Sequence, residues 1–124
     1  MLLLPNEREA IKRTWIERQR KNKIEMQKRM NEAFCCAKKV AYFLKENYGV
    51  DKVYLYGSLA KGEYFDKLSD IDLYITGWKN EKQYWSMLAE AQSLSRPYPI
   101  SIVTEREALP SLKQIVEKEG ILLV

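Results

Sequence analysis

Two aspartates one residue apart are the side chains best suited to chemistry in this sequence. Asp70 and Asp72 flank Ile71 at the start of a stretch, 71–76, that alternates apolar and polar residues as a half-buried strand does. Residues two apart on a strand share one face, so both carboxylates are expected on the open side of a rigid element. Hard carboxylate oxygens suit Mg²⁺ or Mn²⁺, and the pair therefore predicts a metal site at Asp70 and Asp72.

A glycine–serine pair upstream adds the features of a phosphate site. Gly57 and Ser58 follow an aromatic and β-branched stretch, 53–56, which predicts another strand. A glycine at that strand end lets backbone amides approach a phosphate, and the Ser58 hydroxyl is a further donor. Lys61 is a candidate for a phosphate contact, and a solvated lysine is an equally good interpretation of it. A metal beside such a turn would bridge phosphate oxygens and orient an attacking hydroxyl.

The composition excludes several other chemistries. The 124 residues include no histidine, which rules out Ser-His-Asp and Cys-His catalysis and histidine-ligated zinc. The two cysteines are neighbours, Cys35 and Cys36, and we interpret them as small buried or half-buried side chains of a protein in the reducing cytoplasm. Hydrophobic residues make up 46% and charged residues 31%, as in one globular domain, and no apolar run could span a membrane.

The first third of the chain predicts helix. The 43 residues between Pro5 and Gly49 contain no proline or glycine, with Asn6 a candidate N-cap and Gly49 a candidate C-cap. An apolar stripe from Met26 to Tyr48 predicts a core-facing side, and a second stripe begins at Ile11 and Trp15. A charged stretch, 17–23, separates the two stripes, so one long helix and two shorter helices both remain open.

The net charge of +4 comes from this same segment. Residues 7–32 carry nine basic and five acidic side chains, and the remainder of the chain is neutral. A solvated helix face, a docking surface for an acidic partner and self-association through the N-terminal helix are the alternatives. No base-reading motif accompanies the charge, so nucleic acid is not an expected partner.

The remaining elements predict a small sheet packed with helices. Residues 81–94 and 109–119 favour helices, 100–103 favour a strand, and 121–124 favour a short one. The expected fold class is α/β (α+β), with a mixed sheet of three to four strands. We expect a basic helical extension over residues 1–32 and a domain over residues 33–124.

The order of these motifs resembles the nucleotidyltransferase superfamily, whose hallmark is Gly-Ser, a loop of about ten residues, and Asp-x-Asp. It is most similar to the minimal nucleotidyltransferases, including MntA-like antitoxins paired with HEPN-domain toxins. The resemblance covers residues 35–124 and rests on three stretches: Gly57-Ser58-x-Ala60-x-Gly62, Ser69-Asp70-Ile71-Asp72-Leu73 and Ile115–Leu122.

The resemblance implies transfer of AMP from ATP, with Mg²⁺ or Mn²⁺, to a hydroxyl acceptor such as a tyrosine of a HEPN-type toxin. Gly57 and Ser58 would hold the triphosphate, and Asp70 and Asp72 would ligate metal and carry the catalysis. The sequence departs from the family at Ser101, where a third carboxylate is expected. The alternative is therefore a catalytically impaired homologue that binds protein or nucleotide, unless Glu63, Asp66 or Glu105 replaces the missing acid.

Overall fold

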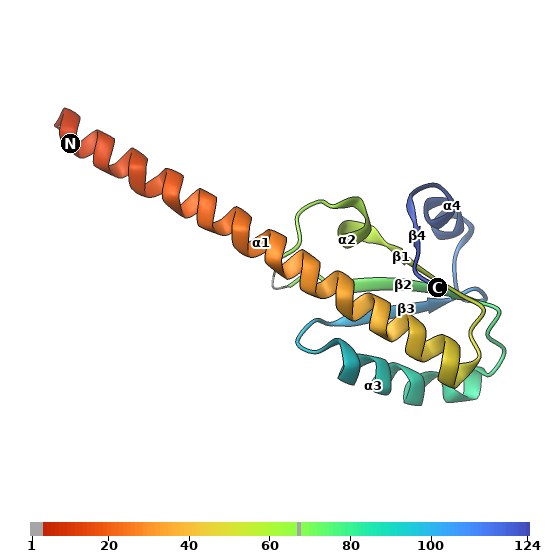
Figure 1. Cartoon of the computed structure of the whole chain (residues 1–124). Coiled ribbons are helices and arrows are strands. Elements are labelled where there is room, and N and C mark those ends of the chain that lie inside the picture. Colours follow the sequence, from red (N-terminus) through yellow and green to blue (C-terminus); the bar gives the residue numbers. More distant parts are fainter. Residues whose placement is uncertain (1–3, 67) are drawn as a thin grey trace.

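A four-stranded sheet packed between helices forms the body of the protein (Figure 1). The computed structural model describes residues 4–66 and 68–124. The strand order is β3-β2-β1-β4, with β2 and β3 parallel and the other neighbours antiparallel. This confirms the expected mixed sheet and fold class. The strands are β1 (Lys52–Tyr56), β2 (Ile71–Thr76), β3 (Ile100–Thr104) and β4 (Ile121–Leu122).

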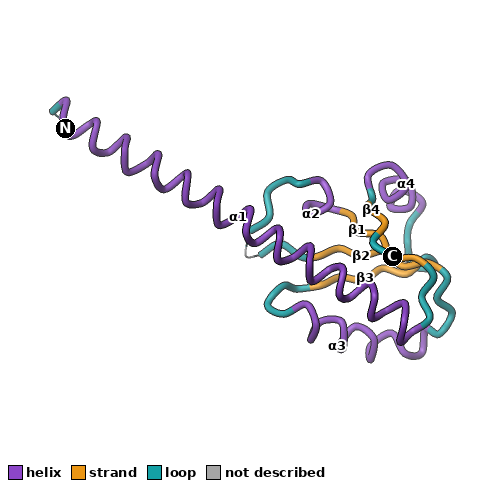
Figure 2. The backbone as a smooth tube through the Cα atoms, viewed as in Figure 1, coloured by secondary structure: helices purple, strands orange, loops and turns teal. Residues whose placement is uncertain are grey.

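The helices follow the expected order, with one addition after β1 (Figure 2). A single-turn helix begins directly at Gly57, and a 3-10 turn over Glu81–Gln83 precedes the helix that was expected from residue 81. The helices are α1 (Pro5–Tyr48), α2 (Gly57–Lys61), α3 (Tyr84–Ser95) and α4 (Pro110–Glu119). None of the helices in the described ranges is both long and apolar enough to cross a membrane.

The helix α1 is one continuous element of 44 residues, which resolves the question of one helix or two (Figure 1). Residues 4–25 are exposed, and full burial begins at Met30. The prediction that Asn6 is the N-cap was wrong, because the helix begins earlier with Leu4 as its cap residue. Pro5 suits the first helical position since it needs no hydrogen-bond acceptor there, and the Glu7 carboxylate accepts a hydrogen bond from the Leu4 amide. Gly49 is the left-handed C-cap, as predicted, with φ of 68°.

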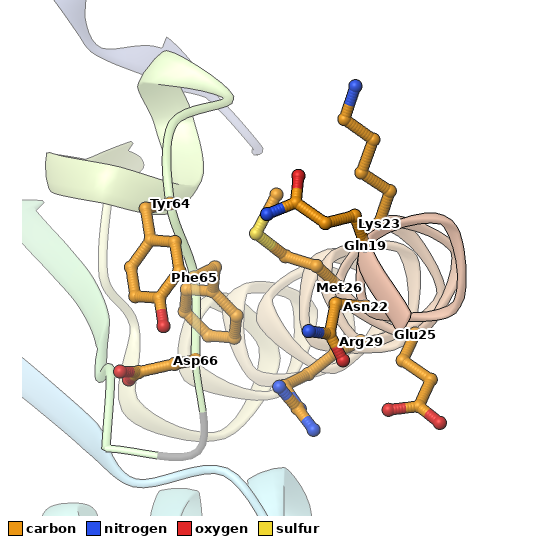
Figure 3. A pocket seen from close by; sticks show the side chains of 9 residues that line it. All are labelled: Gln19, Asn22, Lys23, Glu25, Met26, Arg29, Tyr64, Phe65 and Asp66. Carbon is orange, nitrogen blue, oxygen red and sulfur yellow. The ribbon is translucent and has the colours of Figure 1, made fainter. Parts of the chain in front are cut away.

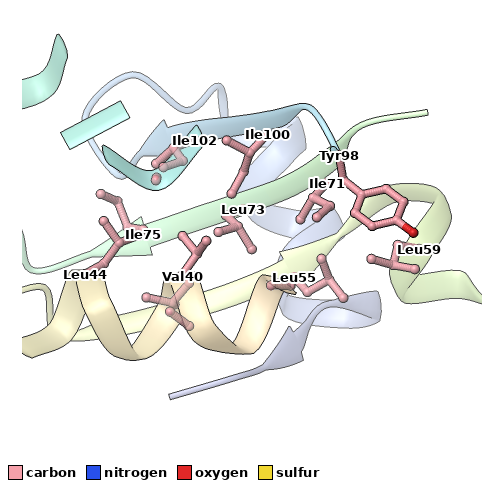
Figure 4. Packing of buried hydrophobic residues seen from close by; sticks show 14 of the residues in the cluster. Val40, Leu44, Leu55, Leu59, Ile71, Leu73, Ile75, Tyr98, Ile100 and Ile102 are labelled. Atoms are coloured by element: carbon pink, nitrogen blue, oxygen red, sulfur yellow. The ribbon is translucent and has the colours of Figure 1, made fainter. Parts of the chain in front are cut away.

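The sheet has one apolar face, which α1 and α3 cover (Figure 4). Alternate residues of β1, β2 and β3 point into this core because side chains alternate along a strand. The cysteine interpretation holds for half-buried Cys36 but was wrong for Cys35, which is exposed. The small residues Ala33 and Ala37 occupy the helix face that contacts the core there. The core strand residues are Val53, Leu55, Ile71, Leu73, Ile75, Ile100 and Ile102.

The opposite face of the sheet is polar and aromatic, and α4 covers part of it. Val116 of α4 and Ala108 pack against Tyr74, with Tyr54 and Tyr56 beside them. This layer is smaller than the apolar core and leaves the Asp70 end of β2 uncovered by helix α4. The face that the candidate site uses is therefore the less completely packed one.

Candidate active site

One row of side chains crosses three strands at the open end of this polar face. Asp72 on β2 pairs in register with Tyr56 on β1 and with Ser101 on β3. Directly paired residues lie on the same face, so the Asp72 carboxylate lies between a phenol and a serine hydroxyl. The neighbouring Ile71 and Leu73 are fully buried on the other face, which fixes the orientation of Asp72.

The glycine of the Gly-Ser pair directly adjoins the Asp72 carboxylate. Gly57 has φ of 79°, and a Cβ added there would lie 2.4 Å from Asp72 Oδ2. Both the left-handed backbone and the close approach exclude a larger residue. The turn after β1 and the acidic strand β2 are thus packed into one site, with Ser58 following immediately on α2.

The Asp72 carboxyl has a raised pKa for two reasons. Burial is the main cause and the charge of Asp70 the second, and together they raise the Asp72 pKa from 3.8 to about 6. Burial and the charge of Asp72 also raise the pKa of Tyr56. Asp70 lies just before β2 and is exposed, so the pair combines one accessible carboxylate with one half-buried carboxylate.

These two carboxylates fit a hard divalent cation. A cation bound between Asp70 and Asp72 would offset their mutual repulsion, which contributes to the raised pKa of Asp72. Carboxylate oxygens are also the ligands that Mg²⁺ and Mn²⁺ prefer. Two protein ligands leave the remaining coordination positions to phosphate oxygens and water, as is usual for Mg²⁺ bound with a nucleotide.

No third acid completes the set in the part of the chain that the structure describes. No group of three or more His, Cys, Asp or Glu side chains there is positioned to hold a metal ion. On β3, the residue in register with Asp72 is Ser101. The suggested substitutes have other contacts: the Glu105 carboxylate accepts a hydrogen bond from the Gly77 amide, and Asp66 accepts hydrogen bonds from the Leu68 amide and the Ser69 hydroxyl.

Lys61 ends α2 and forms an ion pair with α4. Its Nζ lies 3.4 Å from Glu119 Oε2, and both side chains are about half exposed. A pair this exposed contributes little to stability and is readily exchanged. Lys61 can therefore leave Glu119 for a phosphate near Ser58 at small cost.

A separate groove of about 560 Å³ lies on the α1 side of the molecule (Figure 3). Gln19, Met26 and Arg29 of α1 form one wall, and Tyr64 and Asp66 of the loop before β2 form the other. Asp66, a candidate replacement for the missing acid, lines this groove, and the other predicted site residues do not: Gly57, Ser58, Lys61, Asp70 and Asp72. No sequence pattern indicates the groove, because its two walls are far apart in the chain.

One family of known proteins matches most of this chain. The family model described as Polymerase beta, Nucleotidyltransferase matches residues 38–124, which include β1, β2, β3 and the Gly57 turn. The N-terminal 37 residues, most of helix α1, lie outside the match. No curated protein sequence matches this chain.

Several solved structures share the fold. A crystal structure of an MntA toxin–antitoxin variant has 26% identity and a TM-score of 0.56, covering 69% of this chain and 69% of that one. A toxin–antitoxin structure with AMP-PNP has 23% identity and a TM-score of 0.57, covering 70% and 72%. A structure of a tri-AMPylated Shewanella oneidensis HEPN toxin in complex with MNT antitoxin contains a chain with 22% identity and a TM-score of 0.55. The match covers 74% of this chain and 71% of that one. At the identities of the last two, the likeness shows a common fold.

Proposed function

This chain belongs to the polymerase beta nucleotidyltransferase family, and we propose that it transfers AMP from ATP to a hydroxyl acceptor with Mg²⁺. The observation that carries the proposal is the contact between Gly57 and the Asp72 carboxylate. It joins a turn suited to phosphate and a carboxylate suited to metal in one place.

In the proposed reaction, the acceptor oxygen forms a bond to the α-phosphorus of ATP while the bond to the β-phosphate oxygen breaks and pyrophosphate leaves. Gly57 and Ser58 would hold the triphosphate through the backbone amides and the hydroxyl, and Lys61 would contact it after leaving Glu119. Asp70 and Asp72 would hold Mg²⁺, which when bound neutralises phosphate charge.

The proton of the attacking hydroxyl needs an acceptor, and Ser101 is a poor one. A carboxylate at that position would accept it directly, whereas a neutral serine hydroxyl has almost no basicity at pH 7. We infer that the wild-type enzyme is slow and that Ser101→Asp accelerates it.

The proposed acceptor is a tyrosine hydroxyl of a HEPN-domain protein, which gives the chain the role of an antitoxin. The support is the similarity to MNT antitoxins, one of which is in complex with an AMPylated HEPN toxin. This chain resembles them in fold and itself matches a nucleotidyltransferase family, so the same class of acceptor is the first to test.

The experiment is incubation of the purified protein with radiolabelled ATP, Mg²⁺ and a purified HEPN-domain toxin. Label on the HEPN protein and release of pyrophosphate are expected, and both should disappear with EDTA or in the Asp70→Asn, Asp72→Asn double variant. Label that persists in the double variant would contradict the proposal. Glu46→Gln, the same kind of charge change at an exposed position of α1, is the matched control and should leave the rate unchanged.

The second candidate is a catalytically impaired homologue that binds a protein or nucleotide, and Ser101 is the observation in its favour. It predicts a stable complex with the HEPN-domain protein that forms equally well with the Asp70→Asn, Asp72→Asn variant, with no transfer even after Ser101→Asp. Turnover by the wild-type chain would exclude it.

A further inference from the structure

A second cavity lies on the same polar face of the sheet as Asp72. It has a volume of about 450 Å³ and lies between the sheet and α4. Tyr54 and Tyr74, which line it, form the next in-register pair on this face after Tyr56 and Asp72. The proposed nucleotide transfer uses none of its lining residues. Those that carry the argument below are Tyr54, Tyr74, Thr76, Glu105, Lys113 and Glu117.

The inner wall of the cavity contains a tyrosine, Tyr74, whose ring is almost entirely buried and whose hydroxyl remains accessible. Tyr74 is only 6% exposed, and its hydroxyl forms no hydrogen bond with any residue in the described ranges, although it lines the cavity. Two other tyrosines have protein partners: half-buried Tyr84 donates to the Ile102 carbonyl, and buried Tyr98 donates to the Glu32 carboxylate. Because this hydroxyl opens onto the cavity, water or a ligand can reach it and bond to it. The cavity therefore offers an unmet hydrogen-bonding group to a ligand.

The charges around this hydroxyl are mainly negative. After burial, Glu105 and Glu117 are the main causes that raise the pKa of Tyr74, so both carboxylates lie near the phenol. Lys113 is the one cation among the described lining residues. With two carboxylates against one ammonium, the cavity disfavours a phosphate or another anion. It is electrostatically distinct from the Gly57 turn.

The aromatic rings provide a second preference for a cation. The Tyr54 and Tyr74 ring centroids are 6.2 Å apart with their planes tilted by 47°. Tyrosine faces attract cations, and guanidinium groups stack on such rings while donating hydrogen bonds in their own plane. The acceptors within the lining are the hydroxyls of Tyr54, Tyr74 and Thr76 and the carboxylates of Glu105 and Glu117.

We propose that this cavity binds a guanidinium group. Its five N–H donors match the several oxygen acceptors of the lining, which the three donors of an ammonium group match less well. The group is supplied by a small guanidino compound or by an arginine side chain of a protein. In either source, the bound molecule lies on the face that carries Asp72. The proposal is independent of nucleotide transfer and stands if the chain proves inactive.

The test is isothermal titration calorimetry of the full chain with two probes: agmatine, and the peptide acetyl-Ala-Arg-Ala-amide. Micromolar to low-millimolar binding of agmatine is expected, with butylamine at least about tenfold weaker. Tighter binding of the peptide than of agmatine assigns the cavity to a protein arginine, and the reverse assigns it to a small molecule.

Three variants locate the site. Glu117→Gln should weaken agmatine binding by about tenfold, and Lys113→Ala should strengthen it by removing the opposing charge. Glu119→Gln makes the same charge change on the same helix outside the cavity and should leave binding unchanged. Absence of heat from either probe up to about 10 mM, or equal weakening by the Glu117 and Glu119 variants, would overturn the proposal. The opposite signs expected for Glu117→Gln and Lys113→Ala distinguish a local charge effect from general loss of folding.

Discussion

The two faces of the sheet differ sharply in what they contribute. On one face, residues such as Val53, Leu55 and Leu73 are fully buried beneath α1 and α3. On the other face, their immediate neighbours are only partly buried: Tyr54 lines the tyrosine-lined cavity, and Asp72 lies in the candidate active site. The same strands therefore supply both the stability and the chemistry.

The difference between the two faces explains why the candidate site is rigid although α4 covers only part of its face. Because side chains alternate along a strand, Ile71 and Leu73 anchor Asp72 from behind without contributing to its environment. Burial of uncharged side chains stabilises the fold, and part of that stability is offset by a carboxylate pair that a cation has not neutralised.

The largest effect is expected on the apolar face. Leu55→Ala should lower the free energy of unfolding by about 3 kcal/mol, because it leaves a cavity under α1 where the side chain is fully buried. Leu122→Ala, on the opposite face and 54% exposed, is the matched control, with an expected loss below about 0.5 kcal/mol. Urea denaturation measures both. Similar losses would show that the two faces contribute equally.

The next expected effect is a gain in stability, from a substitution on the polar face. The folded pKa of Asp72, about 6, exceeds the ordinary value of 3.8, so the folded state binds this proton more strongly than the unfolded state. Stability should therefore fall as the pH rises from about 4 to 6, by about 1–3 kcal/mol. Asp72→Asn should remove this fall and be more stable than the wild type at pH 8 while losing transfer activity.

Thermal unfolding at pH 4 and pH 8 without Mg²⁺ checks the Asp72 prediction. The Asp66→Asn variant is the control, because hydrogen bonds to the Asp66 carboxylate lower its pKa, chiefly that from the Leu68 amide. Asp66→Asn should destabilise the protein at pH 8. A destabilised Asp72→Asn variant at pH 8 would contradict the assignment of net repulsion to the acid pair.

A smaller difference in stability is expected between two glycine substitutions. It separates the cost of close packing at the site from the cost of the left-handed backbone. Gly57→Ala and Gly62→Ala both place an alanine at positive φ, 79° and 70°, at a cost of about 1 kcal/mol each. The Cβ at residue 57 also meets the Asp72 carboxylate, whereas residue 62 has nothing within 4 Å. We expect Gly57→Ala to lose about 1–2 kcal/mol more than Gly62→Ala, together with nucleotide affinity. Equal losses in urea denaturation would mean that the turn and Asp72 are not in contact.

The smallest effect is expected where α1 extends beyond the sheet. Trp15 is 61% exposed with no strand beneath it, so Trp15→Ser should change stability by less than about 0.5 kcal/mol. Met30→Ser, in the same helix but 8% exposed, should cost several times more. A large loss for Trp15→Ser, measured over a range of protein concentrations, would reveal that another chain covers this surface.

The sequence predicts the sheet better than the contacts between elements. Alternating stretches predict β1, β2 and β3, because burial on one face leaves a period of two in the residues themselves. The continuity of α1 could not be predicted, since the charged residues 17–23 suit a solvated helix and a connecting segment equally. The start of α1 was missed because a proline at the first helical position needs no side-chain cap.

The residues of the candidate site could be predicted from the sequence, but the side chains that surround and contact them could not. The Gly-Ser and Asp-x-Asp motifs point to Gly57, Ser58, Asp70 and Asp72. The pairing of Lys61 with Glu119 depends on how α4 packs over the sheet, which local sequence does not encode. The tyrosine-lined cavity was missed for the same reason, since tyrosines on strands are usually packing residues.

The continuous helix α1 also forms a long arm that extends from the body of the protein. Its exposed part, residues 4–25, extends about 30 Å at 1.5 Å per residue, and residues 30–44 are clamped against the sheet. A force applied near Ile11 is transmitted as torque to the strands that carry Asp70 and Asp72. A partner bound at the end of α1 would thus set the orientation of the face that carries Asp70 and Asp72, and a spectroscopic label placed there would report that orientation.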